Sequence, residues 1–206
     1  MKQTGYFITF EGLDGCGKST QAKLLADALE REGFKVLRTR EPGGSLFSEH
    51  LRKIILDPNH RVSPITELLL YEASRASHTD EVIRPALEKN FVVICERYSD
   101  ATIAYQGFGR GLPLKKIKFI DRFATGGLKP HLTIFLEIPV ERSLARIRRK
   151  KDRLEMENKS FYMRVLQGYR KIRKQQKKRF VVVKGTGNIK KIHERVLSAV
   201  KKCLKI

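Results

Sequence analysis

Five short apolar segments recur along the chain. Each is rich in valine, isoleucine or phenylalanine, and they span residues 6–11, 35–39, 91–96, 131–138 and 180–184. Short runs that stay apolar without strict alternation are typical of strands buried on both faces, as in a parallel sheet. The pattern therefore predicts a five-stranded parallel sheet.

Between these segments the apolar residues recur with the spacing of amphipathic helices. The clearest case is residues 19–32, where Leu24, Leu25 and Leu29 share one stripe and Gly33 follows as a stop. The same spacing predicts helices over residues 46–56, 64–78, 79–89, 114–124, 140–150, 158–178 and 189–204. Strands alternating with helices indicate an α/β fold with helices on both faces of the sheet and ligands at the carboxyl ends of the strands.

The length and the cysteines narrow the class of protein. A chain of 206 residues suits one domain, so we expect residues 1–206 to form a single domain. No apolar run approaches the roughly 18 residues that cross a membrane, and the first residues lack a signal-peptide pattern. Cys16, Cys95 and Cys203 form no CxxC pair, which argues against a disulfide framework or structural zinc. The sequence predicts a cytoplasmic protein with no membrane partner.

The positive charge is concentrated in the last third of the chain. The formal net charge is +21, and residues 142–206 carry 23 lysines and arginines against four acidic residues, a net charge of +19. Such a concentration indicates either a polyanion-binding surface or the solvated helix faces of a chain adapted to heat or salt. The run at residues 170–179 fits a solvated helix face better.

The strongest chemical signal is a complete GxxxxGK[ST] motif at residues 12–19, between the first predicted strand and the first predicted helix. Such a P-loop aims backbone N–H groups at phosphate oxygens, and the positive end of the following helix adds to the attraction. We expect Lys18 to reach the β- and γ-phosphates as a catalytic residue, and Ser19 to offer its hydroxyl to Mg²⁺. The expected ATP contacts are Gly12, Gly15, Cys16, Gly17, Lys18, Ser19 and Thr20.

Four further segments follow the P-loop in a specific order. They are REPGG at residues 40–44, YEASR at residues 71–75, ERY at residues 96–98 with AYQG at residues 104–107, and DRLE at residues 152–155. Together with the P-loop, and at these spacings, they resemble the thymidylate kinases over residues 7–197. The resemblance implies transfer of the γ-phosphate of ATP to dTMP with Mg²⁺, and a homodimer. The NKxD motif of G proteins does not occur in the sequence.

The resemblance also implies how dTMP is held. Tyr71 and Arg75 lie four residues apart on a predicted helix and share a face, where a ring can stack on a base while a guanidinium bonds its rim. In the family this pair holds thymine, and Gln106 takes the other polar edge of the base. Arg97 and Arg52 resemble the residues that grip the dTMP phosphate, and Arg97 is also expected to be catalytic.

Four more residues complete the implied acceptor site. Asp14 should repel ATP and so face the acceptor, where the resemblance implies a hydrogen bond from the sugar 3′-hydroxyl. Glu41 resembles the residue beside the same sugar and phosphate, and Tyr105 the ring that excludes a ribose 2′-hydroxyl. Thr102 stands where bacterial relatives commonly have Ser and keeps the hydroxyl.

Magnesium is the only metal that the sequence indicates. Glu96 stands at the tip of a predicted strand, where the family usually has Asp, and the resemblance implies that it and Ser19 hold Mg²⁺, with water as a bridge to the longer side chain. No other group of His, Cys and carboxylate residues has transition-metal spacing.

The basic segment after the fourth predicted strand resembles the lid of nucleotide kinases and is expected at about residues 146–157. The family divides between members with an arginine in the P-loop and members with arginines in the lid. Here Gly15 and Cys16 occupy the P-loop positions, so we expect charge neutralisation from the lid. The candidate catalytic arginines are Arg146, Arg148, Arg149 and Arg153. Adenine is expected between Arg142 and the loop at residues 185–188.

Two other functions stay open on sequence alone. A nucleic-acid-binding P-loop ATPase would account for the basic tail, but the chain has no nucleic-acid recognition motif and the acceptor segments would have no purpose. A kinase for another nucleoside monophosphate would use the same P-loop. We expect no specific nucleic-acid partner.

Overall fold

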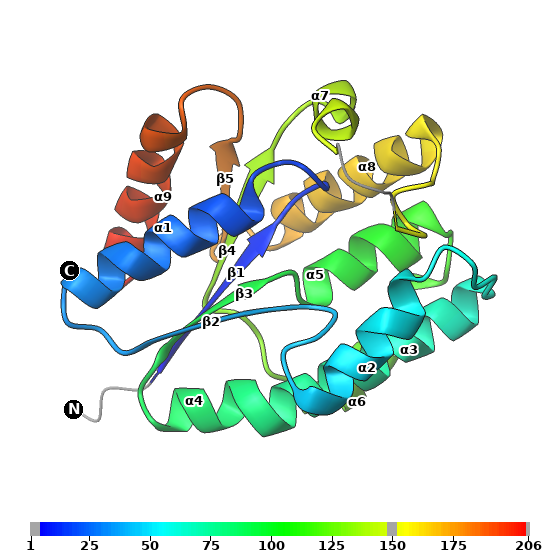
Figure 1. Cartoon of the computed structure of the whole chain (residues 1–206), viewed down its shortest axis with the longest axis horizontal. Helices are drawn as coiled ribbons and strands as arrows, with labels where there is room; N and C mark the ends of the chain where they lie inside the picture. The colour runs from blue at the N-terminus through cyan, green and yellow to red at the C-terminus, as the bar shows by residue number, and fades with distance from the viewer. Residues whose placement is uncertain (1–4, 148–151, 205–206) are drawn as a thin grey trace.

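The computed structural model describes residues 5–147 and 152–204. Within them, five strands form one all-parallel sheet in the order β2-β3-β1-β4-β5, as Figure 1 shows. The strands are β1 (Tyr6–Glu11), β2 (Val36–Arg40), β3 (Val92–Glu96), β4 (Leu132–Glu137) and β5 (Phe180–Lys184). The predicted five-stranded parallel sheet is confirmed.

The register brings the ends of the central strands to one edge. Phe10 of β1 lies opposite Glu96 of β3 and opposite Ile134 of β4. The P-loop that follows β1 therefore emerges beside the residue that follows β3. This is the carboxyl edge of the sheet, where ligands gather in open α/β folds.

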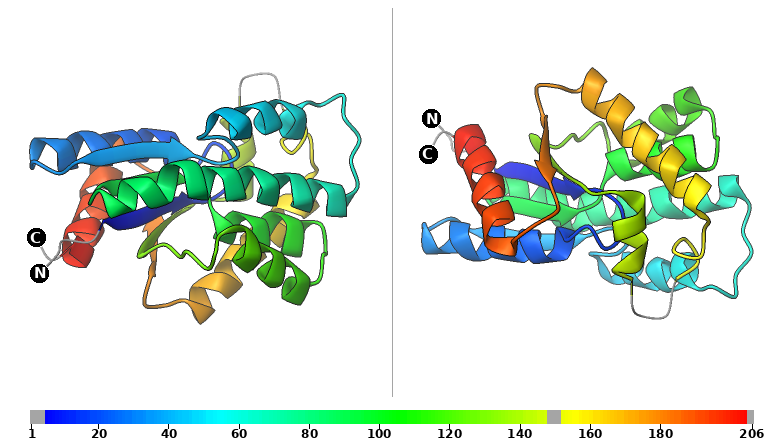
Figure 2. Two further views of the ribbon diagram at one scale, coloured as in Figure 1. Left: turned by 90° about the horizontal axis from the view of Figure 1, so that it is seen from below. Right: turned by 90° about the horizontal axis from the view of Figure 1, so that it is seen from above.

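Helices α1 (Lys18–Arg31) and α9 (Ile189–Leu204) lie side by side over one face of the sheet (Figures 1 and 2). Their apolar stripes bury Leu25, Leu29 and Val196 against Ile8 and Phe10 of β1. Alternate residues of the same strands point to the opposite face. Because helices cover both faces of the sheet, the strands bury side chains on both faces and are therefore apolar throughout.

The opposite face of the sheet packs against α4 (Arg84–Glu88), the last part of a long helical segment. Residues 64–88 are helical without a break, as α3 (Pro64–His78), the π-helical turn η1 (Thr79–Ile83) and α4. On this face Phe7 of β1 packs in a cluster with Ile83 and Tyr98. Two separate helices were predicted here, but Thr79 keeps right-handed helical geometry and joins them.

Helix α8 (Lys159–Gln175) covers the same face near β4 and packs on a helical segment that the sequence did not predict, α5 (Ser99–Thr102) with η2 (Ile103–Gly109). A Cβ on Gly109 would lie 2.6 Å from the Phe161 ring of α8. Glycine disfavours helices in isolation, so the local pattern hides a segment that tertiary packing holds helical.

The other helices are α2 (Leu46–Leu56), α6 (Leu114–Ala124) and α7 (Val140–Ala145). Three helices begin at side-chain caps, where Ser45, Ser63 and Asn158 each accept a hydrogen bond from a backbone N–H three residues later. The helix predicted over residues 140–150 ends at Ala145, and its last residues lie outside the described part. Among the described helices, none combines the length and apolar character needed to cross a membrane.

Candidate active site

Two adjoining cavities open at the carboxyl edge of the sheet. The P-loop cavity, about 570 Å³, lies over residues 14–20, and the inner cavity, about 90 Å³, lies between the P-loop and helices α2 and α3. Residues that line both are Asp14, Glu41, Arg52 and Arg97. The two cavities therefore share a wall that is made entirely of charged side chains.

Backbone geometry shapes the P-loop. Gly12 and Gly15 have φ angles of 141° and 71°, in the region that favours glycine. A Cβ on Gly12 would lie 2.7 Å from the Leu136 carbonyl oxygen, and one on Gly15 would lie 2.7 Å from the Ser143 carbonyl oxygen. Helix α1 begins directly afterwards at Lys18 with no side-chain cap. Its first N–H groups are left for an anion, as the motif predicts.

Lys18 and Ser19 lie where the motif predicts them. The Lys18 ammonium is nearly buried, donates to the Leu13 carbonyl at 2.9 Å and lies 3.9 Å from an Asp14 carboxylate oxygen. The Ser19 hydroxyl donates to Glu96 Oε2 at 2.5 Å, so the two predicted metal residues are in direct contact. The longer side chain of Glu96 thus reaches the Ser19 hydroxyl, and the metal-binding role of the two residues stays a prediction.

The donor set at this point suits a hard cation. A hydroxyl and a carboxylate are the oxygen ligands that Mg²⁺ prefers, with the rest of its shell taken from phosphate and water. Within residues 5–147 and 152–204, no group of three His, Cys, Asp or Glu side chains is arranged to hold a metal. The residues present therefore fit a metal that enters with a polyphosphate.

Arg97 is the centre of the wall between the cavities. It follows β3 with a φ of 68°, a left-handed conformation that costs energy for a residue with a side chain. Its Nη2 donates to Asp14 at 2.7 Å and to the Tyr105 hydroxyl at 3.0 Å, and its Nη1 donates to the Tyr169 hydroxyl at 3.3 Å. The side chain is 14% exposed, so the guanidinium is held by these contacts while one face stays open to the cavities.

Asp14 is ionised at this position. Burial of the carboxyl works against its charge, but the cations of Arg97 and Lys18 outweigh burial and lower the pKa of Asp14 to about 2. Tyr105 adds a hydrogen bond to the second oxygen at 3.2 Å. A carboxylate inside a phosphate-binding loop is therefore accommodated by two flanking cations.

Arg75 lies almost fully buried behind the inner cavity, with its side chain 1% exposed, and is ion-paired with three acidic residues. Its Nε donates to Glu41 at 2.8 Å, its Nη1 donates to Glu72 at 2.7 Å, and Asp121 forms an ion pair with Nη1 at 3.3 Å. Burial alone would lower the pKa of Arg75, but these carboxylates raise it well above its usual value. Nη1 also donates to the Thr102 hydroxyl at 2.8 Å, which brings these two predicted residues together.

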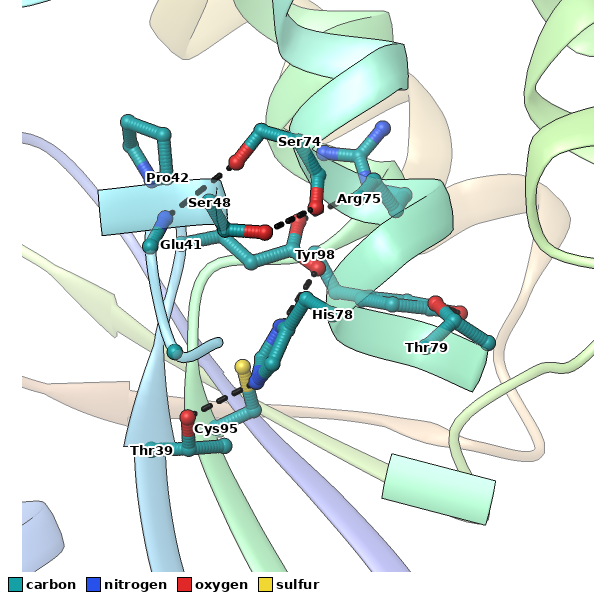
Figure 3. A network of polar contacts seen from close by, with 12 residues as sticks. Thr39, Glu41, Pro42, Ser48, Ser74, Arg75, His78, Thr79, Cys95 and Tyr98 are labelled. Carbon is teal, nitrogen blue, oxygen red and sulfur yellow. Dashed lines mark hydrogen bonds and ion pairs between the residues drawn. The ribbon is translucent and has the colours of Figure 1, made fainter. Parts of the chain in front are cut away.

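The other oxygen of Glu41 faces His78 at the end of α3 (Figure 3). His78 Nδ1 lies 3.1 Å from Glu41 Oε1, and Nε2 lies 2.7 Å from the Thr39 hydroxyl. A Cβ on Gly44 would fall 2.3 Å from the imidazole, so glycine is required beside the ring. Glu41 is thus held from both sides at the boundary of the two cavities.

The structure gathers every predicted acceptor residue around the inner cavity. They are Asp14, Glu41, Arg52, Tyr71, Arg75, Arg97, Thr102, Tyr105 and Gln106. Arg52 donates to the Pro42 carbonyl at 2.6 Å, and Gln106 donates to Glu67 at 2.8 Å. The sequence singled these residues out from segments as far apart as the P-loop and η2, and the fold brings them within one cavity.

The predicted lid arginines are divided. Arg146 lines the P-loop cavity and donates to the Gly15 carbonyl at 3.2 Å, whereas Arg148 and Arg149 lie outside the described residues. Arg153 lines neither cavity: it donates to Glu67 of α3 and to the Ile55 carbonyl of α2. Arg153 was predicted to act on the phosphates together with the other lid arginines. In the structure it is bound to the buried carboxylate of Glu67 on α3 instead.

Two further predicted ATP contacts, Thr20 and Arg142, occupy different places in the structure. Thr20 lines the P-loop cavity, while Arg142 is exposed on α7 and lines neither cavity. A Cβ on Gly185 would lie 3.3 Å from the Cys16 carbonyl, so the loop at residues 185–188 begins against the P-loop. The adenine contacts remain a prediction.

Four buried residues that support the site were not predicted from the sequence. They are Glu11, Glu67, His78 and Tyr169, and each is 0% or 1% exposed. Glu67, His78 and Tyr169 form hydrogen bonds with side chains of the shared wall or of the inner cavity, and Glu11 is linked to that wall through Tyr169. The available signal was chemical: charged residues placed among apolar residues of a predicted buried strand or helix are rarely left unpaired.

Comparisons with known proteins show which family this chain resembles. The family model described as thymidylate kinase matches residues 10–196. The thymidylate kinase of Geotalea daltonii is 48% identical over 95% of this chain and 96% of its own, and that of Kosmotoga olearia is 46% identical over 97% of each. The crystal structure of thymidylate kinase from Ehrlichia chaffeensis matches with a TM-score of 0.81 at 31% identity, over 96% of this chain and 99% of its own. The chain therefore belongs to the thymidylate kinase family.

Proposed function

We propose that this protein transfers the γ-phosphate of ATP to dTMP, giving dTDP and ADP, with Mg²⁺ bound near Ser19 and Glu96. The observation that carries the proposal is the shared wall of the two cavities. A phosphate group in the P-loop cavity and one in the inner cavity would meet at Arg97, which lines both. ATP hydrolysis alone would give the inner cavity no purpose.

The reaction needs no nucleophile from the protein. A phosphate monoester with a second pKa of about 6 is largely dianionic at neutral pH and attacks directly. The protein must instead bring two polyanions together and neutralise their charge. Lys18 would hold the donor phosphates and Arg97 the acceptor phosphate, and Mg²⁺ supplies further positive charge to the donor.

The base and sugar would occupy the inner cavity. Tyr71, 9% exposed, offers a ring for stacking, while Arg75 and Gln106 offer polar groups at the edge of the base. Tyr105 is fixed by its bonds to Arg97 and Asp14, so it cannot easily move aside for a ribose 2′-hydroxyl. The proposed acceptor is therefore a deoxynucleotide.

We further infer a lid at about residues 146–157 within a single kinase domain of residues 1–206. Arg146 at its start already lies against the P-loop, and Glu155 lines the same cavity. Closure would bring arginines onto the transferring phosphate and exclude water, which suits a P-loop that has no arginine of its own.

A homodimer and a cytoplasmic location are also proposed. Phe119 and Phe123 on α6 are 75% and 85% exposed, and Ile65 and Leu69 on the neighbouring α3 are 61% and 50% exposed. Large apolar side chains that gather on adjacent helices mark protein interfaces, and a second copy is the partner that the family implies. The three free cysteines suit a reducing compartment. Sedimentation of the wild type beside Phe123→Glu tests the dimer.

The decisive experiment is a coupled ADP-release assay with ATP, Mg²⁺ and each nucleoside monophosphate in turn. We expect dTMP to give the highest kcat/KM and dUMP a lower one, because the lost thymine methyl removes about 1 kcal/mol of apolar contact. UMP and CMP should be far weaker, because their 2′-hydroxyl meets Tyr105. A higher kcat/KM with CMP or UMP would reject dTMP as the substrate and leave the kinase class in place.

A further inference from the structure

Glu67 is a buried carboxylate that touches neither substrate cavity. It lies in the first turn of α3 with 1% exposure, and four hydrogen-bond donors surround it. Gln106 Nε2 and Arg110 Nε donate to Oε1 at 2.8 and 3.1 Å, while Arg110 Nη2, at 3.0 Å, and Arg153 Nη1 donate to Oε2. Of these donors, Gln106 alone belongs to a residue that lines the inner cavity.

This contact fixes which way the Gln106 amide points. An ionised carboxylate only accepts hydrogen bonds, so the group that faces Glu67 must be the NH₂ of Gln106 and not its carbonyl. Burial works against the charge of Glu67, but hydrogen bonds from Arg110 and Gln106 outweigh burial and lower its pKa. No hydrogen-bond partner of Gln106 Oε1 is found among the described residues, which leaves this carbonyl oxygen as the polar atom available to the inner cavity.

We propose that Glu67 determines base specificity as a positioning residue, by holding the Gln106 amide so that its carbonyl oxygen receives the base. A base with a ring N–H at this edge, as in thymine and uracil, then donates a hydrogen bond to Gln106. A base with a bare ring nitrogen there, as in cytosine, places two acceptors against each other and is rejected. This inference rests on the proposed function, in which Gln106 reads the edge of the base.

The surroundings of Glu67 keep the carboxylate from rotating. Arg110 donates to both oxygens of Glu67 and also to Glu157, while Arg153, which belongs to the inferred lid segment, donates to Oε2. The Arg110 guanidinium also lies 4.8 Å from the Phe161 ring centroid. Discrimination by hydrogen bonding requires that the Gln106 amide does not rotate, and Glu67 meets this requirement as long as it stays ionised, which Arg153 supports even without Arg110.

The test compares dTMP with 5-methyl-dCMP, which carries the same methyl group but a bare ring nitrogen. In Glu67→Gln, the position of Oε2 faces two guanidinium donors, Arg110 Nη2 and Arg153 Nη1, and so favours the carbonyl; the new NH₂ then turns toward Gln106 and gives up the hydrogen bond from Arg110 Nε. Gln106 then presents its carbonyl to residue 67 and its NH₂ to the cavity. We expect the ratio of kcat/KM for dTMP to that for 5-methyl-dCMP to fall at least tenfold, and Glu67→Asp, which still only accepts, to keep most of the wild-type ratio.

Arg110→Met is the matched control, because it removes an ion-pair partner of Glu67 without touching the base-facing amide. It should lower thermal stability and leave the ratio near the wild-type value. An equal loss with both substrates in Glu67→Gln, or a wild type that uses 5-methyl-dCMP as well as dTMP, overturns the inference. A wild type that phosphorylates no thymine nucleotide overturns the proposed function instead.

Discussion

Arg97 donates a 2.7 Å hydrogen bond from the end of β3 to Asp14 in the P-loop, and this ion pair forms the wall between the two cavities. The planar guanidinium also reaches Tyr105 and Tyr169, which a lysine ammonium on a flexible stem cannot do at once. We predict that Arg97→Lys lowers kcat/KM for dTMP at least about 100-fold although the charge is kept. Steady-state kinetics with a melting curve for each variant checks this, and near-normal kinetics would show that charge alone suffices.

Lys18 is expected to act on the transferring phosphate. One preorganised charge at developing negative charge is worth roughly 3 kcal/mol, so Lys18→Ala should lose at least about 100-fold in kcat and stay folded. Lys23→Ala is the control, because Lys23 lies on the same helix, exposed and paired with Asp27. Turnover in Lys18→Ala equal to that of the control would remove the P-loop lysine from the mechanism.

Two interpretations of the basic last third of the chain can be distinguished by mutation: a catalytic lid and a nucleic-acid-binding surface. Arg146→Gln should lower kcat far more than Lys171→Gln or Lys174→Gln, because a guanidinium in a dry site acts more strongly than an exposed ammonium in a screened field. Arg148→Gln and Arg149→Gln should behave like Arg146→Gln. ATP hydrolysis without dTMP is measured with and without DNA. Equal small losses together with DNA-stimulated hydrolysis would favour the nucleic-acid ATPase instead.

His78 offers a test of how Glu41 is held. The amide nitrogen of an asparagine can replace Nδ1, which faces Glu41, whereas that of a glutamine can replace Nε2, which faces Thr39. We expect His78→Gln to raise the KM for dTMP severalfold and to cost about 1–3 kcal/mol of stability, since a buried carboxylate oxygen loses its partner. His78→Asn should keep KM closer to the wild type, and Thr39→Val should affect stability alone. The same KM in both His78 variants would argue against positioning.

Glu11 should make stability depend on pH. Burial and the charge of Asp100 raise the pKa of Glu11 from 4.5 to about 7, against the opposing effect of Arg97. Between these two values the folded state binds the proton more tightly than the unfolded state, so the free energy of unfolding should fall as pH rises. Over that window the stability difference between the wild type and Glu11→Gln should shift by roughly 3 kcal/mol in favour of the variant. Urea unfolding at pH 4.5 and pH 7.5 measures the shift, and parallel curves would contradict it.

The strands and most helices were predictable because their signals are local. Apolar runs mark β1 and β4, and caps such as Ser63 mark helix starts within a few residues. The helical segment formed by α5 and η2 was not predictable, because Gly107 and Gly109 weaken its local preference. The segment is helical because it packs closely against α8 and α6, and only small residues such as these glycines allow that close approach.

The candidate site shows the same division. The sequence determined the P-loop, since its glycines set the local backbone and Lys18 bonds the Leu13 carbonyl of the same loop. It also supplied the acceptor residues through their motifs. It did not reveal that Arg153 would bind Glu67, 86 residues earlier in the chain.

Only the tertiary structure decided which charges meet. Tyr169 of α8 donates to Glu11 of β1 at 2.7 Å and accepts from Arg97, although it lies 158 residues from Glu11 and 72 residues from Arg97 in the sequence. A buried charged group needs a polar partner, and that partner can come from any part of the chain that the fold brings close. The spacing of residues in the sequence does not show which residues become neighbours. The sequence by itself therefore determined which chemical groups this protein has for phosphoryl transfer, while the packing of α3 and α8 around the sheet decided how those groups are oriented.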